Sequence, residues 1–398
     1  MKNTITFILL LLSIGLWGYL PTVHLFKHWG QISFFLCLIS YIQVYHKDNL
    51  LFKNAIILFF IGTIFNIFSA YFNNGQNMRY TFQAFGSFHI LLLYFLLHYI
   101  ETEKKYLERF ILIFGIIFTV LFFIQRSAFP NILFSGNIIY DNARNTVRIR
   151  MMGAGFCNLA FYMQLNKFLL KRKIFDIGLA LLFFTVLFVN GYRTLIASTV
   201  LVSGFMFLKM VKYSPMNYLM IVVAVVGLIG FLQIGSNAKL LESMINLTQS
   251  QQEQGDDYIR AIALNYFKHV YPRNFSYYLF GGGLPVGIGS YGAYMRHLEQ
   301  DLGIWWVDIG VVGFYFVVGG VTLLGMAWYS IKSLFIKLPK ESKYLGFFFA
   351  YLILTTITTA EIYSGGMMVV QAVALYLIDV SAAEKEEEDA DVEVANNP

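Results

Sequence analysis

The sequence has little charge: Asp, Glu, Lys and Arg make up 13% of its 398 residues, whereas 58% of the residues are hydrophobic. Soluble domains carry about 25% charged residues, and one soluble core could not bury this much apolar surface. The composition therefore excludes a soluble globular protein and predicts an all-α polytopic membrane protein. The formal net charge of +6 resides mainly in short connections between apolar runs, as orientation in a membrane requires, so nucleic acid is not an expected partner.

Cysteine and proline are also scarce. The two cysteines, Cys37 and Cys157, both lie in apolar runs, which argues against a disulfide framework and against a cysteine metal site. All seven prolines fall between or beyond the apolar runs, as expected where each spanning helix must satisfy its own backbone hydrogen bonds. The glycines Gly287, Gly289 and Gly292 have a G-x-G-x-x-G spacing, but no predicted strand precedes them and no G-K-[ST] of a P-loop is present. This segment is therefore interpreted as a pliable turn and not as a nucleotide site.

The apolar runs define the predicted membrane domain, residues 1–380. If about 17 to 25 apolar residues cross a bilayer, the chain has about twelve spans, at residues 4–20, 31–46, 51–72, 80–99, 109–125, 151–166, 174–190, 194–210, 217–235, 304–329, 344–361 and 366–380. The first run is taken as a span and not as a signal peptide, because no A-x-A-like cleavage site follows it. The acidic segment 381–398 is predicted to be a disordered cytoplasmic tail.

The distribution of cations predicts the orientation of the chain. Short outer connections carry only Lys27, Arg79 and Arg193. The inner connections carry many more: Lys47, Lys53, Lys104, Lys105, Arg109, Lys167, Lys171, Arg172, Lys173, Lys209, Lys212, Lys332, Lys337, Lys340 and Lys343. By the positive-inside rule both termini are cytoplasmic. Two longer loops, residues 126–150 and 236–303, then face the periplasm, and because long loops translocate whatever their charge, their cations do not oppose this topology.

These two loops make the outer surface locally basic. A basic cleft that faces away from the cytoplasm suits an anionic ligand such as a phosphate or pyrophosphate. Anchoring to anionic lipid headgroups is the alternative explanation for any single arginine. Within the second loop, DYIRAIALNYFKHVY repeats apolar residues with helical period and predicts a helix that lies on the membrane surface, with Arg260 and Lys268 on its other side.

Particular polar residues stand close to predicted span ends. Arg193 lies in VNGYRTLIAST, in a very short connection between two apolar runs. Asp308 and Glu361 are also predicted near span ends, and pairing of such carboxylates with arginines would be a purely structural explanation for all of them. The loops offer only scattered Asp256, Asp257, Glu299 and Asp301 as oxygen ligands, so no divalent metal and no cofactor is expected.

Three segments taken together resemble the bacterial O-antigen polymerase and O-antigen ligase family. They are NGYRTLIAS at a span start, a long outer loop with RAIALNYF and YLFGGGL, and RHLEQDLGIWWVDIGVVGF leading into a span. The resemblance covers about residues 150–330 in motif order, whereas the N-terminal third matches only as generic spans.

The resemblance implies a metal-independent, inverting membrane glycosyltransferase of the GT-C type in the bacterial inner membrane. Its donor would be an oligosaccharide on polyprenyl pyrophosphate, and its protein partners would be a chain-length regulator or a flippase. Arg193 and Arg260 match the arginines expected to hold the pyrophosphate, a role that suits the bidentate guanidinium. Further candidates for a supporting role are Arg148, Arg150, Tyr192, Arg273, Arg296 and Glu361. Arg296 lacks a counterpart in the family motifs.

The expected catalytic base remains open between His297 and Asp301. Ligase-like members carry a His-Asn pair about ten residues before the span, and alignment on Asp308, Gly310 and Gly313 places Gln300 and Asp301 there. A histidine near its normal pKa suits proton abstraction from a sugar hydroxyl, whereas Asp301 holds the matching register. The absence of the His-Asn pair at this register is a departure from the ligase-like members. It favours a polymerase of O-antigen or capsule repeat units in lipopolysaccharide or related polysaccharide biosynthesis. A ligase that transfers the glycan to a lipid or protein, and a transporter or flippase, are the alternatives.

Overall fold

The computed structural model describes the chain except residues 1, 16–28, 48–49, 135–136, 143–145, 211–234, 256–257, 360, 364–365 and 397–398. The described part is mostly helical. Its first half contains α1 (Lys2–Ile14), α2 (Trp29–Val44), α3 (Lys53–Asn74), α4 (Met78–Ala84), α5 (Gly86–His89), α6 (Leu93–Ile100), α7 (Lys104–Ala128), α8 (Ala154–Lys171), α9 (Ile174–Val189) and α10 (Arg193–Met210). A hairpin of β1 (Asn137–Asp141) and β2 (Thr146–Arg150) follows α7, so the fold is not strictly all-α.

The second half begins with helices of the long loop and returns to apolar helices. The loop carries α12 (Gly235–Glu253), α13 (Ile259–His269), α14 (Phe275–Phe280), α15 (Gly289–Arg296) and a π-helical turn, η5 (His297–Asp301). The apolar part contains η6 (Trp306–Ile309), α16 (Gly310–Val318), α17 (Gly320–Phe335), α18 (Tyr344–Thr356), η8 (Glu361–Tyr363) and α19 (Met367–Asn396). The predicted helix in this loop therefore exists as α13, with Ala263 and Phe267 of its apolar face buried; its position on a membrane surface stays a prediction.

Four helices of the described part are long and apolar enough to cross a membrane: α3, α7, α10 and residues Met367–Asp391 of α19. Two bent pairs, Met78–Ala84 with Gly86–Ile100 and Gly289–Asp301 with Trp306–Val318, raise the number of candidate spans to six. Other predicted spans coincide with helices that are shorter than a bilayer crossing, among them α1, α9 and α18. The helix α8 has 18 residues but is not among the four. The predicted span at 217–235 lies almost entirely outside the described residues.

Small residues permit close helix packing in the apolar bundle. A Cβ atom at Gly62 of α3 would lie 2.5 Å from the backbone nitrogen of Thr322, and a Cβ atom at Gly325 of α17 would lie 2.4 Å from that of Phe59. The backbones of α3 and α17 therefore approach each other directly at these points. Without a hydrophobic driving force between helices in lipid, such van der Waals contact is a main source of association.

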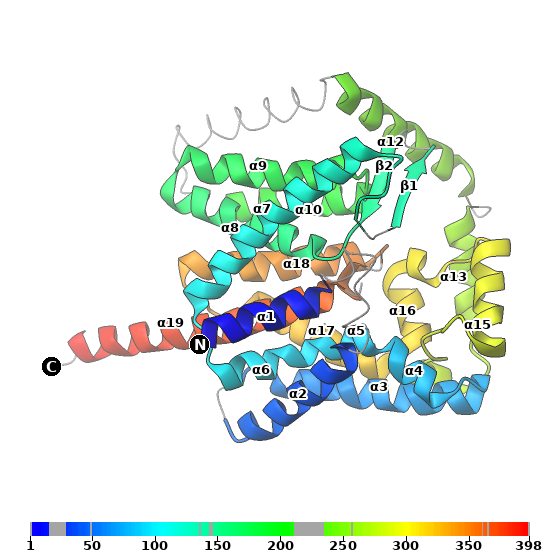
Figure 1. Ribbon diagram of the computed structural model, residues 1–398, viewed down its shortest axis with the longest axis horizontal. Coiled ribbons are helices and arrows are strands. Elements are labelled where there is room, and N and C mark those ends of the chain that lie inside the picture. The colour runs from blue at the N-terminus through cyan, green and yellow to red at the C-terminus, as the bar shows by residue number, and fades with distance from the viewer. Residues whose placement is uncertain are drawn as a thin grey trace.

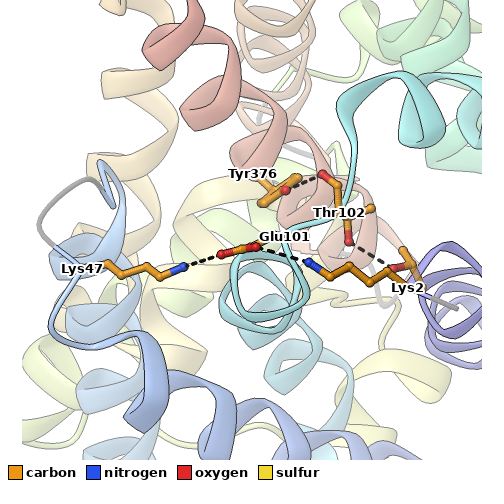
Figure 2. Close-up of polar contacts among 6 residues, drawn as sticks. Lys2, Lys47, Glu101, Thr102 and Tyr376 are labelled. Carbon is orange, nitrogen blue, oxygen red and sulfur yellow. Dashed lines mark hydrogen bonds and ion pairs between the residues drawn. The ribbon is translucent and has the colours of Figure 1, made fainter.

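The predicted inner connections meet at one end of the bundle. Glu101, just after α6, accepts hydrogen bonds from Lys2 of α1 (3.3 Å) and from Lys47 after α2 (3.4 Å) (Figure 2). The neighbouring Thr102 pairs with Thr6 through its hydroxyl group (3.0 Å) and accepts a hydrogen bond from Tyr376 of α19 at its carbonyl oxygen (2.5 Å). These contacts join four helices, although the exposed ion pairs add little stability.

The long-loop helices and the hairpin lie at the opposite end. In Figure 1 the N-terminal end of α1 and the C-terminal end of α19 lie to the left, whereas β1, β2, α13 and α15 lie to the right. The helices α13 and α15 lie across that right-hand end and do not run along the bundle. One end therefore carries the chain's two ends with the lysine-rich short connections, and the other carries both predicted outer loops.

The acidic tail differs from its sequence-based description. Disorder is predicted beyond residue 380, whereas α19 continues as a helix to Asn396. Lys385 contacts Glu388 at 3.0 Å and Asp389 at 2.7 Å. Such pairs, three and four residues apart, stabilise a helix that projects from the bundle.

Candidate functional site

The hairpin is fixed to the end of α9 by side chains that bond its backbone. Asn190 accepts a hydrogen bond from the backbone nitrogen of Ile149 (2.8 Å) and donates one to its carbonyl oxygen (3.0 Å). Arg126, in the last turn of α7, donates to the carbonyl oxygen of Val147 (2.9 Å) and to the hydroxyl group of Thr146 (3.1 Å). The strand β2 is thereby held beside the turn between α9 and α10.

This placement brings two arginines of β2 to Tyr192. Arg150 donates a hydrogen bond from Nε to the Tyr192 hydroxyl group (2.9 Å). The guanidinium of Arg148 lies 4.3 Å from the centre of the Tyr192 ring, a cation–π contact, and is paired with Asp141 at 3.2 Å. The Arg150 side chain is exposed, so of these two arginines it is the one that can reach a ligand.

Two carboxylates from distant parts of the chain face Arg150. Burial would lower the pKa of the Arg150 guanidinium, but Tyr192, Asp308 and Glu361 outweigh burial and raise it. Asp308 belongs to η6 and is exposed, whereas Glu361 begins η8 and is partly buried. We call Arg150, Tyr192, Asp308 and Glu361 the Arg150 cluster. It unites β2, the α9–α10 turn and the two breaks before α16 and α19.

Two carboxyl groups at this end have unusually high pKa values. Burial raises the pKa of Glu361 to about 7, and the positive charge of Arg150 opposes the rise. Burial, assisted by the negative charge of Asp308, likewise raises the pKa of Glu299 to about 7. At neutral pH both groups therefore populate the ionised and the protonated forms, which is the condition for proton transfer.

A glycine and a tyrosine hold η6 against η8. Gly310 has φ of +58°, and a Cβ atom there would lie 2.5 Å from the carbonyl oxygens of Thr356 and Ile357 at the end of α18. Tyr363 donates a hydrogen bond to the carbonyl oxygen of Gly310 (2.9 Å), and its ring stacks on Phe314 with centroids 4.0 Å apart. Only glycine satisfies both the backbone angle and the close approach.

Arg193, predicted to bind pyrophosphate, is the first residue of α10 and follows Tyr192 directly. Its guanidinium donates to Thr248 Oγ1 (2.5 Å) and to Gln251 Oε1 (2.6 Å). Both acceptors belong to α12, so Arg193 ties that polar helix to the end of the bundle. The structure therefore brings Arg193 next to the Arg150 cluster but gives it a structural contact as well.

Arg260 lies on α13, which packs against η6 and α16. The side chain of Ile259, its neighbour, passes close to Gly303, where a Cβ atom would lie 3.4 Å from it. Arg260 is partly buried, and no hydrogen bond or ion pair of its side chain is found within the described part of the chain. The helix of Arg260 therefore packs against η6, which carries Asp308. Among the described residues, the Arg260 side chain itself makes no bond to the Arg150 cluster.

The two candidate bases form a pair on the surface. His297 Nδ1 lies 2.7 Å from Asp301 Oδ2, and the side chains are 57% and 66% exposed. Both belong to η5, where one turn of π-helix places them on the same side. Arg296 and Arg273 are exposed in the same loop, and among the residues that the structure describes no hydrogen bond or ion pair joins either of them to the Arg150 cluster.

Sequence reasoning missed how the cluster is assembled. Sequence patterns make Arg150, Tyr192 and Glu361 only supporting candidates and give Asp308 a structural pairing, because the four residues come from four separate segments of the chain. Asn190 and Arg126 went unnoticed, although a polar residue within two positions of Tyr192 and an arginine at a span end are signals that could have directed attention to them.

Comparison with known proteins adds no assignment. No protein-family model matches the chain, and no curated protein sequence matches it.

Proposed function

We propose that this protein is a membrane glycosyltransferase that polymerises lipid-linked oligosaccharide repeat units at the outer face of a bacterial cytoplasmic membrane. The proposal also includes about twelve spans, with both termini in the cytoplasm. The loops at residues 126–150 and 236–303 would face the periplasm. The sequence resemblance described above motivates it. The several apolar helices that could cross a membrane support the location.

One observation carries the proposal from the structure: Arg150 and Arg193 flank Tyr192, beside two carboxylates, at the end of the bundle that lies opposite the lysine-rich connections. Guanidinium groups match phosphate oxygens in pairs and stay charged at any physiological pH. Carboxylates beside them provide groups that can accept a proton. A pyrophosphate-linked sugar requires both kinds of group close together.

In the proposed reaction a sugar hydroxyl of one lipid-linked glycan attacks the anomeric carbon of another. The bond between that carbon and the pyrophosphate oxygen breaks, and polyprenyl pyrophosphate leaves with the electron pair. Arg150 and Arg193 stabilise the charge that develops on the leaving group, and Arg260 contributes from α13. Such preorganised charge is commonly the largest contribution to a rate enhancement.

The experiment is the analysis of lipid-linked glycans in the native bacterium after deletion of the gene. A polymerase predicts that single repeat units accumulate on polyprenyl pyrophosphate at the outer face, and that the wild-type gene restores polymer. Unattached full-length polymer would identify a ligase instead, and repeat units trapped at the inner face would identify a flippase. An unchanged glycan profile would refute the whole proposal.

A further inference from the structure

The acceptor hydroxyl in the proposed reaction must lose a proton, and the Arg150 cluster contains a carboxylate placed to receive it. Glu361 lies in the short break between α18 and α19, where its backbone nitrogen donates to Thr359 Oγ1 (3.4 Å). Within the described part of the chain, its carboxylate makes no hydrogen bond or ion pair. It is partly buried and therefore retains a free acceptor beside the cations that would hold the donor.

Glu361 and Arg150 interact without touching. The segment that carries Glu361 lies beside the start of α10, because Thr358 Oγ1 donates a hydrogen bond to Thr194 Oγ1 (3.2 Å), two residues after Tyr192. Each group shifts the pKa of the other, yet no ion pair joins them in the described structure, and Arg150 Nε donates to Tyr192 instead (2.9 Å). A direct pair would neutralise both groups. In the proposed reaction the leaving pyrophosphate would lie on the side of the cation and the attacking hydroxyl on the side of the carboxylate.

We propose that Glu361 is the general base of this transfer, and the assignment rests on the proposed function. Its carboxylate takes the proton of the acceptor hydroxyl as the new carbon–oxygen bond forms. The pyrophosphate oxygen keeps the electron pair of the bond that breaks. Glu361 returns the proton to bulk water or to the departing pyrophosphate, which restores the carboxylate for the next transfer.

Other carboxylates and the histidine fit this role less well. His297 and Asp301 are exposed and already paired at 2.7 Å, so water competes for the proton. Asp308 is exposed. Glu299 has a similarly raised pKa, but the charged group that acts on it is the carboxylate of Asp308 and not an arginine.

The charged surroundings of Glu361 predict the direction of a pH effect. Arg150 of β2 lowers its pKa, whereas burial raises it to about 7, and Tyr351 of α18 is the other titratable group that interacts with it electrostatically. The carboxylate form grows as the pH rises through about 7, so kcat should rise with it. Removal of the Arg150 charge should move that midpoint to higher pH.

The test measures kcat and KM between pH 5.5 and 8.5 for the purified full-length protein in nanodiscs, with lipid-linked repeat units extracted from the deletion strain. General base catalysis contributes about 10²- to 10⁴-fold. We expect Glu361→Gln to lower kcat by about 100-fold or more at unchanged KM, and Glu361→Asp to restore part of it. His297→Gln tests the competing base and should stay within about fivefold of wild type, far less than the loss of a base. The matched control is Glu242→Gln, which makes the same change at an exposed carboxylate of α12 and should leave kcat unchanged.

A second variant keeps the assignment testable if Glu361→Gln does not fold. Arg150→Gln should raise the pH midpoint of kcat, because the carboxylate loses its cation; an unchanged midpoint would overturn the assignment. A near-normal kcat of Glu361→Gln would overturn it too, as would a loss confined to His297→Gln. Failure of the proposed function is distinct from all of these, because the wild-type protein would then transfer no glycan at any pH.

Discussion

Replacement of Arg193 by lysine separates the proposed role of its side chain in donor binding from its observed contacts with α12. The guanidinium bonds Thr248 Oγ1 at 2.5 Å and Gln251 Oε1 at 2.6 Å, through Nη1 and Nη2. Lysine keeps the charge but loses the planar fork, so it cannot reproduce two bonds in these directions. Each charge-assisted bond contributes about 1.5 to 3 kcal/mol, and exposure of Thr248 reduces the contribution to stability.

The same fork would be lost toward a pyrophosphate. If Arg193→Lys removes one charge-assisted contact that stabilises the transition state by about 1.5 to 3 kcal/mol, the transfer rate falls by about one to two decades. The assay is polymer formation by the purified variant from lipid-linked repeat units, at matched protein level and with the wild type alongside.

The control removes the structural partners and leaves the arginine. Thr248→Ala combined with Gln251→Ala removes both side-chain partners of Arg193 on α12 and leaves only the long bond to the carbonyl oxygen of Met244 (3.5 Å) among the bonds described to that helix. We expect transfer to fall by less than about threefold, which corresponds to well under 1 kcal/mol. If this double variant loses as much activity as Arg193→Lys, the arginine acts by holding α12. The assignment of Arg193 to the donor pyrophosphate would then be wrong.

Three further predictions concern topology, the loop arginine and the hairpin. In a variant without the native cysteines, Gln254→Cys should react with an impermeant thiol reagent added outside the cell and Lys173→Cys should not; the reverse pattern would invert the topology. Arg260→Lys should lower polymer yield in a complementation assay by about tenfold or more, whereas Arg296→Lys should be tolerated; equal tolerance would make Arg260 a lipid anchor. Asn190→Ala removes the two bonds to Ile149 and should destabilise the hairpin by about 2 to 4 kcal/mol, seen as faster proteolysis of residues 137–150; an unchanged rate would contradict this.

Metal independence is the last of the general predictions. Because arginines can neutralise the pyrophosphate, activity should survive an excess of chelator. Loss that magnesium or manganese specifically restores would show that a metal performs that role.

The sequence predicts the helical segments well because apolar length and period are local properties. The predicted segments at 51–72, 109–125 and 174–190 correspond to α3, α7 and α9, with ends within a few residues. Local signals also predict α13. They do not reveal that α16 and α17 are separated at Gly319, with φ of +89°, because a glycine inside an apolar run is compatible with a continuous helix. Nor do they predict the hairpin, whose two short strands gain their stability from Asn190 and Arg126.

The site is predicted less well than the helices because it depends on contacts across the chain. Arg150 and Glu361 lie in distant parts of the sequence, and their electrostatic interaction depends on long-range contacts such as the bonds from Asn190 to Ile149 of β2. Sequence reasoning selects His297 and Asp301 because of their spacing from the motif at Asp308, Gly310 and Gly313. Register carries no information about exposure, which in the structure distinguishes that pair from Glu361.

The most direct test of the account is a transfer reaction with the purified full-length protein in nanodiscs, supplied with lipid-linked repeat units from the deletion strain. The account predicts ladders of glycans that grow by whole repeat units on the lipid, with release of polyprenyl pyrophosphate in proportion to the bonds formed. Intact substrate after prolonged incubation with folded protein, together with an unchanged glycan profile in the deletion strain, would contradict it.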